Sequence, residues 1–493
     1  KETNTFALAN TLASIPYNKK IVSEIIIYVK KEYKKIKSSE LTFIMKLLRK
    51  LIERENSVVT DAPIYMWESV KISDLQKMQK IQNLYKELGL TEFLVNIVNE
   101  FKSTKIFKEF LQVGVAYLYG GNSEVQQEFY KVFISDYDNR VINTLREALS
   151  ACGEGVKTFE KMRLDTLYQD SLRNTFEYLE DVKEETKLDD NDFFERIRES
   201  FPPELTIPCM KVKSHSMMVL LLSFIQGLAE KQCTSLQNFM REQSYMDENG
   251  ETKRLANSFD FLSEFRSLFN SFFKVHSSYN IQVGIKLIDV LTEYIQGDVV
   301  MNVDSLLNKT LLFDMTRVLT DFNNSYHLLP RGYDANPNVG DLRELKSKVI
   351  GFVKALVEFP DATVLARIQK YLDVGGLMDT LESYLCEFFG FNANGIPPEG
   401  AYVIIWERVN TLEMEDFDDG VLIDALNIYM IFCYLWEDKR IFKENINELI
   451  ADSKRSIQRR EVLEIFLFTF CPKIVRGVEF VIQGKQKDLI KYW

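Results

Sequence analysis

Residues 281–297 read IQVGIKLIDVLTEYIQG, and the apolar residues of this stretch recur at helical spacing. At about 100° per residue they fall on two separate stripes. One stripe holds Ile281, Ile285, Ile288 and Ile295, and the other holds Leu287, Val290 and Tyr294. A narrow polar ribbon lies between them, at alternating spacings of four and three residues: Gln282, Lys286, Asp289, Glu293 and Gln296. The pattern predicts a helix with two faces to bury and with Glu293 in a thin polar seam.

A second carboxylate, Glu230, lies in a similar setting in residues 220–243, LLLSFIQGLAEKQCTSLQNFMREQ. Six consecutive apolar residues, 217–222, begin the helix that we expect here, and Ser223 and Gln226 lie on the same side of it as Glu230. Charged side chains are seldom placed within apolar sequence unless they are paired. Glu230 and Glu293 are therefore the two candidate functional residues.

The helical period continues through most of the chain, which has only 11 prolines and 21 glycines in 493 residues to interrupt it. We predict an all-α fold of stacked antiparallel helices, arranged as an armadillo-like helical solenoid. The end of the chain differs, because Val478, Phe480 and Ile482 alternate with other residues before a polar turn at 484–487. This alternation predicts a short C-terminal β-hairpin.

Composition excludes several classes of protein. A net charge of -11 argues against nucleic acid as a partner, because phosphate binding needs a basic face. The six cysteines are far apart and form no CxxC pair, which favours a reducing environment. We find no nucleotide-binding glycine loop, nucleophile elbow or metal motif, and so expect no enzyme. The longest apolar runs, such as residues 428–436, fall short of the roughly 20 residues that span a bilayer.

Residues 118–130, LYGGNSEVQQEFY, read as the end of one helix, a turn and the start of another. Gly120 and Gly121 supply a positive φ after the first helix, and Asn122 or Ser123 can cap the second. A diglycine turn by itself is a weak signal. The whole motif is more specific.

Together with LQNFMREQ at 236–243 and LTEYIQG at 291–297, this motif resembles the cytosolic region before the pore of the tetrameric intracellular calcium-release channels. These are the inositol trisphosphate receptors and the ryanodine receptors. The resemblance covers, with gaps, Ile81–Tyr130, Lys211–Thr380 and about the last thirty residues. It also supports the solenoid, for which no strict repeat period can be read from the sequence alone.

The resemblance implies a calcium site. Glu230 and Glu293 match the acidic pair that binds activating calcium in these channels, with Gln296 and Gln232 nearby; ryanodine receptors have histidine at the position of Gln232. Calcium takes six to eight oxygen ligands, so two glutamates form half of a site. In the family the remaining ligand comes from the C-terminal tail beyond the pore. We therefore expect the cofactor to be Ca2+ and its binding by this chain alone to be weak.

The resemblance also organises the chain. The expected parts are a helical repeat block resembling the receptor homology region at 1–150, an acidic helix and linker at 151–210, a receptor-homology-associated helical domain at 211–389, a loop at 390–420, and helices with a hairpin linker before the pore at 421–493. LTEYIQG leans toward ryanodine receptors, whereas the lack of an EF-hand pair leans toward inositol trisphosphate receptors. In both families the chain continues after a similar hairpin, so we expect this sequence to be a piece of a longer protein.

Two functions remain open. One is a cytosolic regulatory segment of a channel at the endoplasmic reticulum or another internal calcium store, whose partners are the pore, the C-terminal tail, the other subunits of a homotetramer and protein regulators. The other is a free-standing helical scaffold without channel activity. The two glutamates can also be ordinary salt-bridged residues, for instance Glu293 with Lys286.

Overall fold

The computed structural model describes residues 19–55, 70–101, 103–170, 217–247, 249–272, 278–320, 339–359, 361–389, 403, 407, 420–452, 455–474, 476–482 and 486–492. The chain forms two compact units, Lys1–Asn302 and Val303–Trp493. The expected loop at 390–420 and the acidic linker beyond residue 170 lie almost entirely outside the described residues. The five-part division of the sequence therefore stays a prediction.

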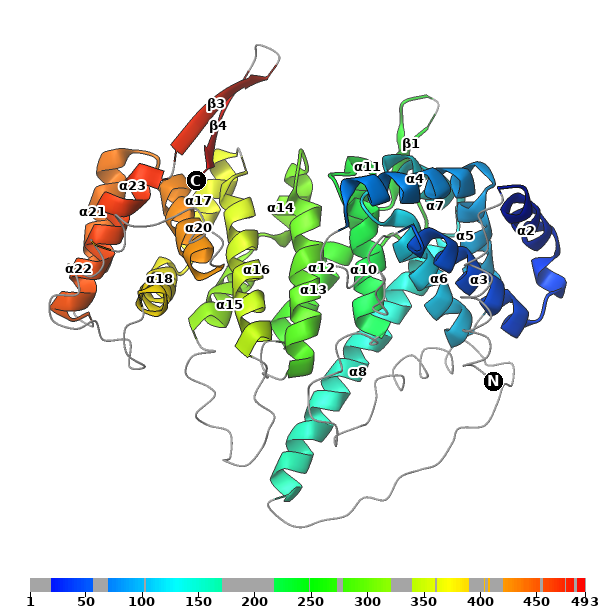
Figure 1. Cartoon of the computed structure of the whole chain (residues 1–493), viewed down its shortest axis with the longest axis horizontal. Coiled ribbons are helices and arrows are strands. Elements are labelled where there is room, and N and C mark those ends of the chain that lie inside the picture. Colours follow the sequence, from blue (N-terminus) through cyan, green and yellow to red (C-terminus); the bar gives the residue numbers. More distant parts are fainter. Residues whose placement is uncertain are drawn as a thin grey trace. The chain divides into compact units, whose positions relative to one another are not determined.

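The first unit is built from helices and one small pair of strands (Figure 1). Its elements are α2 (Lys19–Glu32), η1 (Tyr33–Lys35), α3 (Ser38–Glu53), α4 (Ile72–Glu87), α5 (Leu90–Glu100), α6 (Thr104–Leu118), α7 (Ser123–Ser135), α8 (Arg140–Asp170), α10 (Met217–Ala229), α11 (Thr234–Arg241), β1 (Ser244–Met246), β2 (Thr252–Arg254), α12 (Phe261–Phe272) and α13 (Ser278–Ile295). The short helix α14 (Val300–Leu306) contains the point where the two units divide.

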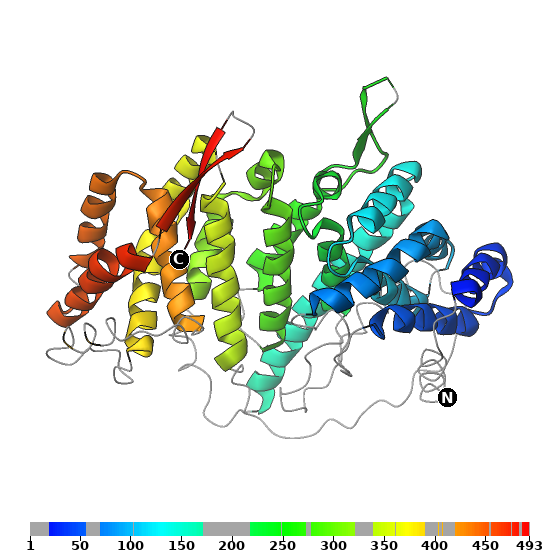
Figure 2. The same cartoon turned by 45° about the horizontal axis from the view of Figure 1, so that its top comes forward.

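Helices α6, α10 and α13 stack side by side through the first unit, as Figures 1 and 2 show for α10 and α13. A Cβ added at Gly114 would lie 2.5 Å from the Phe224 ring, and one at Gly227 would lie 3.1 Å from Leu118. Because these contacts follow the same order along both helices, α6 and α10 run in the same direction. In a helical solenoid the equivalent helices of successive repeats run parallel, as α6 and α10 do. The predicted solenoid-like helical packing is therefore confirmed.

The turn between α6 and α7 has the predicted conformation. Gly120 and Gly121 have φ angles of 77° and 60°, in the left-handed region that favours glycine. The side chain of Asn122 accepts a hydrogen bond from the backbone N–H of Glu124 at 3.2 Å and caps α7. Local sequence therefore determines where α6 ends and α7 begins.

The second unit is also helical and ends in a hairpin. Its elements are α15 (Lys309–Thr320), α16 (Val339–Val357), α17 (Ala362–Tyr371), α18 (Val374–Phe388), α20 (Gly420–Leu435), α21 (Lys439–Ile450), α22 (Ile457–Ile465), the π-helical turn η6 (Phe466–Phe470), α23 (Cys471–Ile474), β3 (Arg476–Ile482) and β4 (Gln486–Tyr492). Helix α18 packs against α15, α20 and α22. Within the described ranges, no helix is both long and apolar enough to cross a membrane.

The predicted C-terminal hairpin is present. Strands β3 and β4 pair antiparallel, with Val478 opposite Ile490 and Ile482 opposite Gln486. A second hairpin was not expected from the sequence. Strands β1 and β2 pair antiparallel with Tyr245 opposite Lys253, so the region between the two candidate glutamates is not helical throughout.

Candidate functional site

Helix α13 buries both of its apolar stripes, as its sequence pattern predicts. Every member of the two stripes is at most 6% exposed, from Ile281 to Ile295. The polar ribbon between the stripes is half-buried along its whole length, and Glu293 lies in it near the end of the helix. The two buried faces thus leave the Glu293 carboxylate little room to reach water.

Glu230 lies just beyond the C-terminal end of α10, whereas the sequence pattern predicted that it lies within the helix. Helix α10 ends at Ala229, and Lys231 and Gln232 have φ angles of 57° and 60°. These left-handed residues turn the chain sharply between α10 and α11. Backbone hydrogen bonds from Gly121 and Gly120 reach the Glu230 carboxylate and oppose the rise in its pKa that burial causes. The α6–α7 turn therefore faces Glu230.

The two glutamates interact electrostatically. Burial, together with the negative charges of Glu230 and Asp289, raises the pKa of Glu293 to about 7, while Lys286 and a hydrogen bond from Gln226 act in the opposite direction. Burial also raises the pKa of Glu230. Like charges held together away from water repel each other, and a bound cation removes that repulsion.

One oxygen of this pair lacks a partner. Glu293 Oε2 is buried and accepts no hydrogen bond from any described residue. A buried carboxylate oxygen without a donor is unfavourable by itself, but it is an available ligand for a hard cation. The residues present therefore fit a calcium ion, for which they would supply carboxylate oxygens.

The two glutamines predicted beside the pair lie at the same end of α13. The backbone carbonyl of Gln296 accepts a hydrogen bond from Gln237 Nε2 at 3.0 Å. The side chain of Gln232 lies against Gly297, where an added Cβ would be 3.2 Å from Gln232 Oε1. The hydroxyl of Tyr294 donates to the backbone carbonyl of Ile225 at 3.1 Å and ties α13 to α10. The fold thus gathers all four predicted residues around the C-terminal ends of α10 and α13.

Glu230 and Glu293 provide fewer ligands than a complete metal site needs. Among the residues that the structure describes, no group of three or more His, Cys, Asp or Glu side chains could hold a metal ion. Calcium needs more oxygen ligands than two carboxylates provide. Glu230 and Glu293 by themselves would therefore supply only part of a calcium site.

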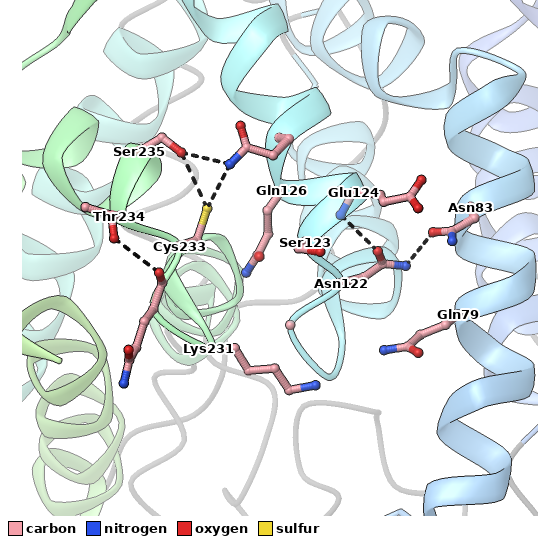
Figure 3. A pocket seen from close by; sticks show the side chains of 13 residues that line it. Gln79, Asn83, Asn122, Ser123, Glu124, Gln126, Lys231, Cys233, Thr234 and Ser235 are labelled. Carbon is pink, nitrogen blue, oxygen red and sulfur yellow. Dashed lines mark hydrogen bonds between the residues drawn. The ribbon is translucent and has the colours of Figure 1, made fainter. Parts of the chain in front are cut away.

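A polar pocket of about 760 Å³, not predicted from the sequence, is lined in part by Lys231 and Gln232, the two residues after Glu230 (Figure 3). It lies between α4, the α6–α7 turn and the α10–α11 turn. Its walls include Gln79, Asn83, Asn122, Gln127, Lys231 and Ser235. The left-handed turn after Glu230 supplies part of this wall, and only the tertiary contact between the two turns creates the pocket.

Comparison with known families agrees with the motifs. Residues 212–319 match the family described as RyR and IP3R Homology associated. The match covers about a fifth of the chain and includes both Glu230 and Glu293. This region is therefore related to the ryanodine and inositol trisphosphate receptors, which are channel receptors and not enzymes. No curated protein matches the chain.

Proposed function

We propose that this chain is a cytosolic regulatory segment of a tetrameric intracellular calcium-release channel, in which Glu230 and Glu293 form half of an activating calcium site. The observation that carries the proposal is the pair itself: two half-buried carboxylates at neighbouring helix ends, one with an unpartnered buried oxygen. Both lie within the region related to these channels. Calcium would add positive charge to that of Lys286 and so favour the ionised form of both carboxylates.

In this proposal the solenoid transmits the binding event to the pore. Oxygen ligands from another part of the channel, such as the C-terminal tail, complete the coordination of a calcium ion bound to Glu230 and Glu293. The ion then links two parts of the channel that move relative to each other. It opens the channel only if it binds more tightly to the open arrangement than to the closed one. The site would face the cytosol at the membrane of the endoplasmic reticulum or another internal calcium store.

Substitution of the pair in the native full-length protein tests the proposal. Glu230→Gln and Glu293→Gln keep the size of the side chain and remove the charge. Each is expected to raise the calcium concentration for half-maximal ion flux in reconstituted vesicles by about tenfold or more. Asp289→Asn, one turn earlier in the same ribbon, is the matched control and should shift it much less. An unchanged calcium response in the Glu230→Gln/Glu293→Gln double variant would rule out the site.

The length of the native polypeptide separates the channel from the alternative scaffold. Peptide mapping of membrane and soluble fractions of the source cells should find these residues in a membrane-bound polypeptide, with peptides from both sides of the segment. A soluble product with this segment as its body would favour the scaffold.

A further inference from the structure

Three turns of the first unit have the same spacing. The residue four positions after each of Ala116, Gly227 and Glu293 has a positive φ: Gly120, Lys231 and Gly297. The residue seven positions after each of the same three residues begins the next helix: Ser123 of α7, Thr234 of α11 and Val300 of α14. The pairs α6–α7, α10–α11 and α13–α14 are thus three copies of one structural repeat, although their sequences differ at most of these positions.

A buried glutamine closes each copy. Gln82 Nε2 donates to the backbone carbonyls of Ala116 and Tyr119, at 2.9 and 3.1 Å. The other two glutamines repeat this contact. Gln126 Nε2 donates to Gly227 and Glu230, at 3.0 and 2.8 Å, and Gln237 Nε2 donates to Glu293 and Gln296, at 2.5 and 3.0 Å. In every copy the two carbonyls are three residues apart. We call these contacts the glutamine clamps.

The clamps satisfy groups that the helices leave open. The last carbonyls of an α-helix have no partner within the helix, and burying them without one is costly. Gln126 and Gln237 are each the fourth residue of their helices, α7 and α11, so each short helix holds the end of the next long helix. All three glutamines are at most 1% exposed. The clamps therefore join successive repeats through the interior of the unit.

Two of the three clamps hold the candidate calcium ligands by their own backbone. Gln126 fixes the carbonyl of Glu230, and Gln237 fixes the carbonyl of Glu293. The first clamp, by Gln82, holds Tyr119 at the corresponding position and fixes the backbone of neither glutamate, although the next two residues, Gly120 and Gly121, face the Glu230 carboxylate. The repeat thus contains the same contact with and without a candidate ligand attached.

We propose that Gln126 and Gln237 are positioning residues for calcium, which set the separation of Glu230 and Glu293 by clamping the ends of α10 and α13. This inference rests on the proposed calcium site. Each carboxylate is only a few bonds from its own backbone. The backbone positions of Glu230 and Glu293 therefore decide whether both carboxylates reach one ion. Release of either clamp frees one helix end, and the pair then loses its preorganised geometry.

The test compares the three clamps in residues 1–493. Gln126→Met and Gln237→Met remove the two hydrogen bonds while nearly keeping the side-chain volume. Gln82→Met is the comparison: it removes the same pair of bonds from a helix end without a candidate ligand, together with the bond that Asn122 Nδ2 donates to Gln82 Oε1. Calcium affinity is measured by calorimetric titration with calcium chloride up to millimolar concentration, at a temperature where each variant is folded by circular dichroism. Melting temperatures report the structural cost.

All three variants should melt several degrees lower than the unsubstituted chain. Gln126→Met and Gln237→Met should also weaken calcium binding by about tenfold or more, as expected for residues that orient metal ligands. Gln82→Met should weaken calcium binding less than either of them, because it releases the backbone of neither glutamate. Equal losses of affinity in all three variants, or none in any, would overturn the positioning role.

The double variant Glu230→Gln/Glu293→Gln distinguishes the two proposals. If it no longer binds calcium while Gln126→Met and Gln237→Met bind normally, the positioning role is wrong and the calcium site stands. If it binds calcium as well as the unsubstituted chain does, the site itself is wrong and the positioning role falls with it.

Discussion

Asp424 shows how a buried carboxylate makes stability depend on pH in the second unit. Burial raises its pKa to about 6, although a hydrogen bond from Ser347 and the charge of Arg343 favour the ionised form. The Ser347 hydroxyl donates to Asp424 Oδ1 at 2.8 Å. Because the pKa is higher in the folded state than its ordinary value of 3.8, folding is penalised above pH 6 and not below pH 3.8.

Asp424→Asn should therefore stabilise the chain at pH 8 by roughly 1–3 kcal/mol and have little effect near pH 4. The substitution removes the charge and keeps an oxygen that can accept from Ser347. Chemical denaturation at the two pH values measures the difference. Ser347→Ala is the control and should destabilise at pH 8, since it removes a donor from the ionised carboxylate. The same stability change at both pH values would contradict this explanation.

Arg455 is a buried cation whose guanidinium donates hydrogen bonds to several groups. Its guanidinium donates to Glu382 at 2.9 Å, to the carbonyl of Leu449 at 2.6 Å and to Asp379. Arg455 and Glu382 are about 5% exposed, so removal of one leaves the other buried with fewer partners. Arg459 contacts the second oxygen of Glu382 at 2.8 Å but cannot replace all of these bonds.

Arg455→Met should reduce the free energy of unfolding by about 3–5 kcal/mol, as expected when a buried ion pair is broken. Arg440→Met is the comparison, since Arg440 pairs with Glu444 on the surface and should cost less than about 1 kcal/mol. Urea unfolding of both variants measures the contrast. Equal effects would mean that the Arg455 network adds no more than a surface pair.

At the scale of elements, the turn between α6 and α7 depends on glycine for two reasons. Gly121 has a φ of 60°, and a Cβ there would lie 2.8 Å from Lys231 Cγ. Gly351, in the middle of α16, is the opposite case, because a Cβ added there meets nothing within 4 Å.

Gly121→Ala should destabilise the chain by about 1–2 kcal/mol, because alanine disfavours a positive φ and the added methyl group crowds Lys231. Gly351→Ala should stabilise it by about 0.5–1 kcal/mol, because alanine is the better helix former. Thermal unfolding of the two variants gives the opposite signs expected. A neutral Gly121→Ala would show that the turn adapts without strain.

The elements also show where sequence patterns succeed. The two stripes and the polar ribbon of α13 are confirmed residue by residue, because a period of 3.6 is a local property of the chain. The hairpin of β1 and β2 was missed, although Asn249-Gly250 between its strands is a known turn signal. Its strands are three residues long and largely polar, so they show no apolar alternation.

At the scale of the whole molecule, the division into two compact units predicts independent folding. Residues 1–307, which include the whole of α14, and residues 303–493 should each be helical by circular dichroism and unfold cooperatively when expressed alone. Limited proteolysis provides the check. Rapid digestion of either piece to small peptides would show that it needs the rest of the chain.

The sequence by itself determined the helical class, the seam that holds Glu293, the diglycine turn, the C-terminal hairpin and the choice of Glu230 and Glu293 as candidates. All of these follow from spacing within a few turns of chain or from short motifs. Only the tertiary structure decided that Glu230 lies outside its helix, that its carboxylate faces the α6–α7 turn, and that Gln126 and Gln237 clamp the two helix ends. Those contacts join residues that are 56 to 110 positions apart. Hydrophobic periodicity tells which face of a helix is buried, but it carries no information about which distant helix covers that face.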